Sequence, residues 1–161
     1  KYYRLYPGNE VRLRYAYIVK CTHVVKDEQG RVVEVHCTYD PSTRSGEGAA
    51  RKVKATIHWV SAEQAVPVEV RLYNRLFLKP NPDDVEEGED FTKYINPASL
   101  EVLYPCYAEP ALATSQVGEK FQFERLGYFC VDPDSTPERL VFNRTVTLKD
   151  EWARIASKME A

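Results

Sequence analysis

The sequence predicts an all-β protein and favours small closed barrels over an α/β enzyme fold. Apolar and polar residues alternate with a period of two in many short runs, and these runs are rich in Val, Ile, Tyr, Phe and Thr. Turn-forming residues interrupt the runs at short intervals, and no strand–helix–strand alternation is visible. At 161 residues the chain is long enough to bury one good core or two small ones.

A long hairpin is expected first, because two alternating runs flank a turn signal at residues 27–30. The Ser- and Gly-rich residues 40–50 predict an exposed loop, and residues 61–64 have the capping-box pattern of about one helical turn. The strands expected in this half are 11–25, 31–39, 52–60 and 68–73.

The second half opens with a connector or mobile loop at residues 78–90, which contain two prolines and six acidic side chains. A short helical turn is expected after Asn96-Pro97, and a tight turn around residues 125–127. The strands expected here are 100–104, 120–124, 127–131 and 140–146, followed by a C-terminal helix at 149–158.

The net charge of −2 conceals an uneven distribution. Residues 1–80 carry 14 basic and 8 acidic side chains, whereas residues 81–161 carry 8 basic and 16 acidic ones. A polyanion is therefore expected to approach the N-terminal half.

Several classes of function are disfavoured by missing signals. No run has the length of a membrane span or the form of a signal peptide, so we expect a cytoplasmic protein that binds no membrane. The four cysteines lack Cys-x-x-Cys spacing, so we expect reduced thiols and no metal site. No phosphate loop or nucleophile elbow is present, and the three histidines lie in strand-like runs, so we expect no catalytic residues.

An Arg-x-Arg pattern in the first strand is the first candidate binding feature. Successive strand residues point to opposite faces, so Arg12 and Arg14 should project together while Val11, Leu13 and Tyr15 face a core. Two guanidiniums about 7 Å apart suit a splayed anionic ligand such as RNA. A solvated outer face of an antiparallel sheet would give the same pattern.

A second candidate lies at a hairpin tip. Gln122 and Glu124 share the face opposite two phenylalanines, and Arg125 follows in the turn. An amide, a carboxylate and a guanidinium together offer donors and acceptors to the edge of an unstacked base. The alternative is an intramolecular Glu–Arg pair.

The N-terminal residues Lys1, Tyr2, Tyr3 and Arg4 also interleave cations with rings, which suits stacking and phosphate contacts or, equally, a barrel edge.

The chain strongly resembles the C-terminal anticodon-binding region of the glutaminyl-tRNA synthetase family over nearly its entire length. Several blocks carry this resemblance in the same order. They are Tyr3–Leu5, Gly8–Tyr17, Cys37–Asp40, Arg51–Lys54, Ile57–Ser61, Arg71–Phe77, Ile95–Pro97, Phe121–Cys130 and Val141–Val146.

The resemblance implies two small β-barrels, related to a ribosomal protein that binds 5S RNA, below a class I catalytic domain. Residues 1–79 would form the outer barrel. Residues 80–161 would form part of the inner barrel, whose first strands the family takes from upstream of Lys1. Members join glutamine to its tRNA with ATP and Mg²⁺, and the barrels read three unstacked anticodon bases. A monomer is expected.

The resemblance also implies roles for particular residues. Arg12 and Arg14 match positions at the first anticodon base, and Gln122, Glu124 and Arg125 match the set around the central uridine. Lys1, Tyr3 and Arg4 match contacts to the third base and nearby phosphates, while Lys149 and Glu151 match further tRNA contacts. A better-known member has Lys in place of Tyr3, and Arg and Thr in place of Lys149 and Glu151.

The class signatures His-Ile-Gly-His and Lys-Met-Ser-Lys-Ser are missing, so this stretch should have no catalytic activity of its own.

Three alternatives remain open from sequence. The same barrels occur in eukaryotic or archaeal-type glutamyl-tRNA synthetases, and a free-standing ribosomal RNA-binding barrel protein would look similar. A structural β-domain that binds protein is the third.

Overall fold

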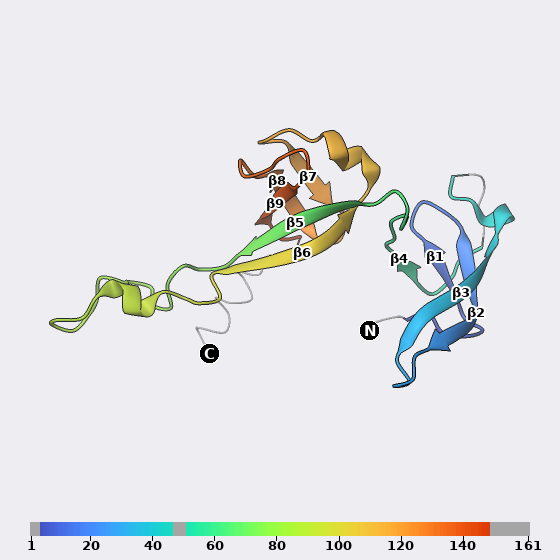
Figure 1. Ribbon diagram of the computed structural model, residues 1–161, viewed down its shortest axis with the longest axis horizontal. Helices are drawn as coiled ribbons and strands as arrows, with labels where there is room; N and C mark the ends of the chain where they lie inside the picture. Colours follow the sequence, from blue (N-terminus) through green and yellow to red (C-terminus); the bar gives the residue numbers. More distant parts are fainter. Residues whose placement is uncertain (1–3, 47–50, 149–161) are drawn as a thin grey trace. The chain divides into compact units, whose positions relative to one another are not determined.

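The computed structural model describes residues 4–46 and 51–148. Within this part of the chain the regular structure is β-strands and three short 3₁₀ turns (Figure 1), which confirms the predicted β class. The chain divides into two compact units, Lys1–Trp59 (the first unit) and Val60–Ala161 (the second unit). The elements are β1 (Glu10–Leu13), β2 (Ile18–Lys26), β3 (Val32–Asp40), η1 (Pro41–Thr43), β4 (Thr56–Ile57), β5 (Val66–Tyr73), η2 (Phe91–Tyr94), β6 (Leu100–Ala108), η3 (Pro110–Thr114), β7 (Lys120–Phe123), β8 (Gly127–Val131) and β9 (Leu140–Val146).

The first unit contains a four-stranded sheet in the order β3-β2-β1-β4. β1 pairs antiparallel with β2 and parallel with β4, and β2 pairs antiparallel with β3. The predicted turn at residues 27–30 joins β2 to β3: the Asp27 N–H donates to the Arg31 carbonyl, and Gly30 has a φ of 78°. A side chain at Gly30 would be strained there, which explains the glycine. Among the described residues of this unit, the buried apolar ones are Val11, Ile18, Val19 and Cys21.

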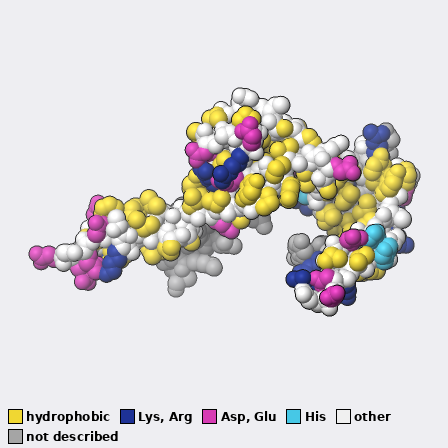
Figure 2. Space-filling model, in the orientation of Figure 1, with side chains coloured by type: hydrophobic (Ala, Val, Ile, Leu, Met, Phe, Trp, Pro, Cys, Tyr) yellow, Lys and Arg dark blue, Asp and Glu magenta, His cyan; other side chains and the backbone are white. Residues whose placement is uncertain are grey.

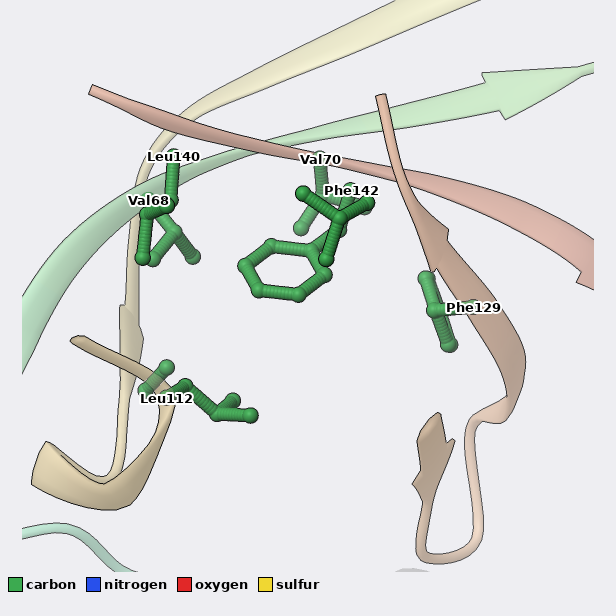
Figure 3. Close-up of a cluster of buried hydrophobic side chains, with 8 residues drawn as sticks. Val68, Val70, Leu112, Phe129, Leu140 and Phe142 are labelled. Carbon is green, nitrogen blue, oxygen red and sulfur yellow. The ribbon is translucent and has the colours of Figure 1, made fainter. Parts of the chain in front are cut away.

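The second unit contains a five-stranded sheet in the order β6-β5-β9-β8-β7. β5 pairs parallel with β9, and the other neighbouring strands pair antiparallel. Side chains from one face of β5, β8 and β9 meet the 3₁₀ turn η3 in a single cluster (Figure 3). Its members are Val68, Val70, Ala108, Leu112, Phe129, Val131, Leu140 and Phe142.

The prediction of small closed barrels is wrong for these sheets, although residues 80–161 were expected to form only part of a barrel. β3 and β4 are the edges of the first sheet, and β6 and β7 are the edges of the second, so neither sheet closes on itself within the described residues. Closure requires the two edges to pair, and each sheet here ends in unpaired strands. The expected C-terminal helix at residues 149–158 lies outside the described residues.

Two predicted strands are shorter than expected. The run 11–25 is interrupted by a turn at residues 14–16, because the Ala16 N–H donates to the Leu13 carbonyl and Tyr15 has a positive φ. The run 52–60 pairs with β1 only at Thr56 and Ile57. The second half fits better, since β8 and β9 have the predicted bounds.

The compact units divide at Trp59, whereas the expected outer and inner regions met at residue 79. β5 pairs with β6 and β9 and so lies in the second sheet. The assignment of residues 1–79 and 80–161 to an outer and an inner region stays a prediction.

β5 and β6 continue beyond the sheet into an arm, residues 74–99 (Figure 1). Backbone bonds link its two sides: the Asn74 N–H donates to Ser99, and Leu78 donates to Tyr94. Asn96 is buried and donates its amide to the Arg75 carbonyl. These bonds join residues 74–78 to residues 94–99, and the connector or mobile loop expected at residues 78–90 stays a prediction.

The edge strand β6 carries large apolar side chains that remain exposed, and apolar groups spread over the visible surface of the second unit (Figure 2). An apolar edge of this kind is a template for pairing with another strand.

Candidate nucleic-acid interface

The predicted binding residues fall into two groups, one in each unit. Arg4, Arg12 and Arg14 belong to the first unit, and Gln122, Glu124 and Arg125 belong to the second. Lys1, Tyr3, Lys149 and Glu151 lie outside the described residues.

The guanidinium of Arg12 is held by the protein's own loops. Its Nη1 donates to the Thr43 carbonyl at 2.8 Å and to the Ala16 carbonyl at 3.3 Å. Nη1 also lies 3.3 Å from Ser45 Oγ, and Nη2 donates to the Arg51 carbonyl at 3.3 Å. Arg12 therefore ties β1 to segments 31 and 39 residues away in sequence, a role that sequence analysis missed.

An ion cluster supports the same loop. The Arg51 guanidinium contacts the Glu10 carboxylate at 2.5 Å and the Asp40 carboxylate at 3.6 Å. The hydrogen bond from Arg51 lowers the pKa of Glu10, and a bond from the Ser42 hydroxyl is the main cause of the lowered pKa of Asp40. All three side chains are solvent-accessible, so the cluster orients the loop more than it stabilises the fold.

A cleft of about 380 Å³ lies beside this loop. Three basic residues, Arg12, Arg51 and Lys52, contribute to its lining together with Ser45 and Thr56. Its lining carries cationic and hydroxyl donors, which suit a phosphate or a base edge.

Arg14 lies in the turn that follows β1. Its backbone N–H donates to the Ile57 carbonyl at 3.0 Å, and its carbonyl accepts a bond from the indole Nε1 of Trp59 at 2.9 Å. The Arg14 guanidinium lies over the Tyr15 ring, 4.9 Å from its centroid. Tyr15 was expected to face a core, but it is 75% exposed, because its positive φ turns it out of the strand alternation.

Arg4 lies in an exposed N-terminal segment that folds back on Asn9. The Asn9 side-chain amide donates to the Arg4 carbonyl, and its oxygen accepts a bond from the Tyr6 N–H. The amide of Asn9 therefore fixes the backbone on either side of Leu5.

The second group lies on the β7–β8 hairpin, as the sequence predicted. Gln122 is exposed and pairs across the hairpin with Tyr128. Phe123, on the opposite face, stacks on Phe129 with ring centroids 4.4 Å apart. This packing anchors the hairpin to the core, so that its polar face points outward.

The hairpin tip has a constrained backbone. Arg125 has a φ of 67°, and Leu126 donates its N–H to the Phe123 carbonyl at 2.9 Å. Gly127 follows with a φ of 146°, and a Cβ there would lie 2.5 Å from the Val146 carbonyl oxygen. The glycine is required by close approach of β9, which fixes the direction in which Arg125 leaves the hairpin.

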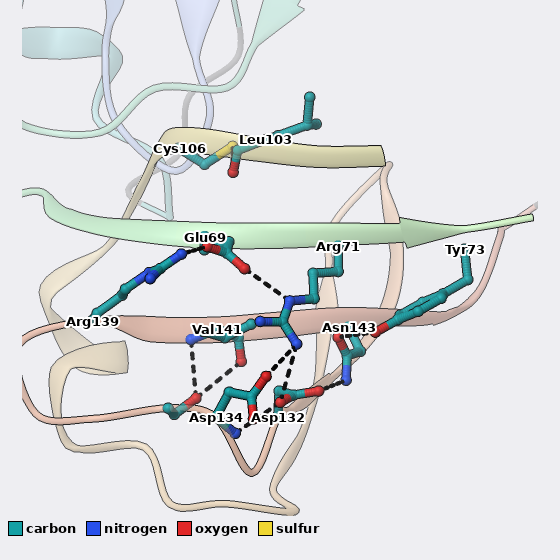
Figure 4. A network of polar contacts seen from close by, with 11 residues as sticks. Glu69, Arg71, Tyr73, Leu103, Cys106, Asp132, Asp134, Arg139, Val141 and Asn143 are labelled. Carbon is teal, nitrogen blue, oxygen red and sulfur yellow. Dashed lines mark hydrogen bonds and ion pairs between the residues drawn. The ribbon is translucent and has the colours of Figure 1, made fainter. Parts of the chain in front are cut away.

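A buried charge network lies on the face of the second sheet opposite the apolar cluster (Figure 4). Glu69 is 1% exposed and accepts bonds from Arg71, at 2.8 Å, and from Arg139. Arg71 also contacts Asp134 at 2.7 Å and Asp132 at 3.4 Å. The network joins β5 to the segment that leads into β9.

The titration of this network follows from its pairing. The bond from Arg71 is the main cause of the lowered pKa of Glu69. Burial acts to raise the pKa of Asp132, but bonds from the Asp134 N–H and the Asn143 amide, with the charge of Arg71, outweigh it and lower the pKa. One pattern in the sequence could have indicated this network: Glu69, Arg71 and Tyr73 share one face of β5 because side chains alternate with a period of two.

Two of the three histidines pack against each other in the first sheet. His23 and His36 stack across β2 and β3 with ring centroids 4.3 Å apart. Among the described residues no group of three or more His, Cys, Asp or Glu could hold a metal ion, and no helix there is long and apolar enough to span a membrane. The four cysteines are free thiols.

Comparison with known proteins assigns these two units to a family. Two models of anticodon-binding domains of class I tRNA synthetases (E and Q) match, one over residues 2–40 and the other over residues 56–132. The chain belongs to this family of tRNA synthetase anticodon-binding domains.

Several curated proteins that are similar to this chain are called glutamine–tRNA ligase. Those of Pseudomonas putida and Nitrobacter hamburgensis are each 56% identical, over 94% and 98% of this chain. That of Rhodopirellula baltica is 54% identical over 98% of the chain. The matched regions make up 27%, 27% and 26% of these relatives, so the chain spans about a quarter of their length.

Proposed function

We propose that this chain is the anticodon-binding region of a glutamine–tRNA ligase, and that it recognises unstacked anticodon bases of the glutamine tRNA. The observation that carries the proposal is identity of 56% to a glutamine–tRNA ligase over 94% of the chain. The family models, which match segments of both units, support it.

The geometry of the two groups supports base reading. Each unit presents an arginine at a turn with a constrained backbone: Arg14 beside Tyr15, and Arg125 at the β7–β8 tip. Planar guanidiniums on rigid turns can donate two parallel hydrogen bonds to a base edge or a phosphate. Gln122 and Glu124 add an amide and a carboxylate, which complement the donors and acceptors of a base.

We assign the residues as follows. Arg12 and Arg14 serve the first anticodon base, with Arg12 acting largely through the loop that it holds. Gln122, Glu124 and Arg125 serve the central base, and Lys1, Tyr3 and Arg4 the third base and its phosphates. Lys149 and Glu151 lie near further tRNA contacts.

The remaining functions belong to the parent protein. A class I catalytic domain would attach glutamine to the tRNA with ATP and Mg²⁺, in the cytoplasm, and the protein would act as a monomer. The anticodon-binding region would contribute tRNA selection and no catalytic group.

A binding measurement tests the proposal. The chain is titrated with an RNA hairpin that carries the glutamine anticodon, and with three hairpins in which one anticodon base is replaced. We expect each replacement to weaken binding by about 1–3 kcal/mol, and log K to fall linearly with log salt concentration. Equal affinity for all four hairpins would contradict base reading, and no salt-dependent affinity would favour a structural domain.

A glutamate-specific parent is the second candidate, because the family description covers both E and Q enzymes. Charging assays with the full-length protein separate the two. Attachment of glutamate to a glutamate tRNA, with no attachment of glutamine, would select the second candidate.

A further inference from the structure

Tyr15 occupies a backbone position that normally excludes a bulky side chain. Its φ of 57° lies in the left-handed region, where Gly and Asn are usual. The turn is closed on both sides, since Ala16 donates its N–H to Leu13, and Leu13 donates its N–H to Tyr17. Burial of the Tyr15 side chain contributes little to the stability of the fold, because this residue is 75% exposed. A strained and exposed aromatic residue is typical of a functional site.

The turn that carries Tyr15 is held by hydrogen bonds to residues that follow β4 or end it. The indole N–H of Trp59 donates to the Arg14 carbonyl at 2.9 Å, and Arg14 donates its own N–H to Ile57 at 3.0 Å. Trp59 is itself 50% exposed. These bonds hold the backbone next to Tyr15 in place at the end of β1.

A permanent cation lies against the ring. The Arg14 guanidinium carbon is 4.9 Å from the Tyr15 ring centroid, and its Nη2 lies 3.4 Å from the tyrosine hydroxyl. An aromatic ring paired with a guanidinium is the combination that binds an unstacked nucleotide, because the ring stacks on the base and the cation meets the phosphate.

We propose that Tyr15 is a stacking residue for one unstacked RNA base, with Arg14 beside it as the polar partner. This inference rests on the proposed function and deepens it, since it adds an aromatic residue to the site that Arg14 serves. A protein partner is disfavoured by the charge: residues 1–80 carry 14 basic and 8 acidic side chains.

The decisive variant is Tyr15→Asn, because RNA binding should weaken while the stability of the fold is kept or raised. Asn tolerates the left-handed region better than Tyr, so the variant should unfold at the same or a higher denaturant concentration. It should nevertheless bind the anticodon hairpin about tenfold more weakly, because one base–ring stack is lost. Loss of both stability and binding would assign Tyr15 a structural role and overturn the proposal.

Three further variants sharpen the result. Tyr15→Phe retains the ring and should bind within about twofold of the unsubstituted chain. Trp59→Phe removes the indole bond and should weaken binding less than Tyr15→Asn does. Tyr107→Leu removes a tyrosine that is 61% exposed on β6, and it should leave affinity unchanged. An equal loss in Tyr107→Leu would mean that any exposed ring contributes nonspecifically.

Fluorescence places the stacked base. The hairpin is labelled with 2-aminopurine at each anticodon position in turn, and stacking on Tyr15 should quench one position in the unsubstituted chain but not in Tyr15→Asn. The salt dependence should keep its slope in the variant, because no phosphate contact is lost. If the unsubstituted chain binds no hairpin, the proposed function fails as well; if it binds and Tyr15→Asn binds equally, only the stacking role fails.

Discussion

The two units present their candidate residues on very different supports. In the second unit the β7–β8 hairpin is anchored by Phe123 stacked on Phe129, next to a continuous apolar core. In the first unit the buried apolar residues are few, and hydrogen bonds from Arg12 hold the loops in place. One candidate surface is therefore held by packing and the other by polar contacts.

This difference has a thermodynamic consequence. Apolar burial stabilises in proportion to area, whereas exposed ion pairs such as Arg51–Glu10 contribute about 0–1 kcal/mol and weaken with salt. The first unit should be the less stable one and the one that RNA orders further. The second unit should keep its structure with or without RNA.

Truncation of a core side chain in the second unit should have the largest effect on the free energy of unfolding. Phe142 is fully buried, so Phe142→Ala should lower the free energy of unfolding of the second unit by about 3–5 kcal/mol. Urea unfolding followed by circular dichroism measures it, and the matched pair Val68→Ala and Val11→Ala, both 1% exposed, compares the two units at equal side-chain size. A larger loss for Val11→Ala would break the comparison.

Removal of the buried carboxylate should have the next largest effect. Glu69→Gln leaves Arg71 and Arg139 without their shared anion and should cost about 3 kcal/mol. The lowered pKa of Glu69 means that its contribution is complete at neutral pH and is lost as the pH falls through the folded-state pKa. Unfolding free energies measured from neutral to acid pH should therefore fall less steeply in Glu69→Gln. Identical slopes would contradict the pairing.

The loop anchor of the first unit should have a smaller effect. Arg12→Lys keeps the charge but cannot reach the Thr43 and Arg51 carbonyls together, so about 2 kcal/mol of unfolding free energy should be lost. Hydrogen exchange should rise around residues 43–45 and leave the second unit unchanged. Lys20→Arg, at an exposed position of β2, is the control and should change neither quantity.

The sequence predicted strands that are bounded by strong turn signals, such as β8 and β9. It predicted the turn at residues 27–30 as well. It also placed Gln122, Glu124 and Arg125 on one hairpin, because period-two spacing and a following glycine define a hairpin locally. These features depend on residues that are close together in the chain.

Features that depend on distant residues were missed. The bonds of Arg12 reach residues 43 and 51, and the buried Glu69 is bonded to Arg139, which lies 70 residues further along the chain. Tyr15 was placed in a core by alternation, which fails where φ becomes positive. Barrel closure was expected from the short strands with frequent turns and from the family resemblance, but neither sheet closes within the described residues.

The most direct test of the central claim couples Arg125 to the central anticodon base. Affinities are measured for the unsubstituted chain and Arg125→Ala, each with the glutamine-anticodon hairpin and with one whose central uridine is replaced. If Arg125 reads that base, the two changes should be non-additive, with a coupling energy of about 1–3 kcal/mol. Strictly additive losses would show that Arg125 does not read the central base, and would contradict the account.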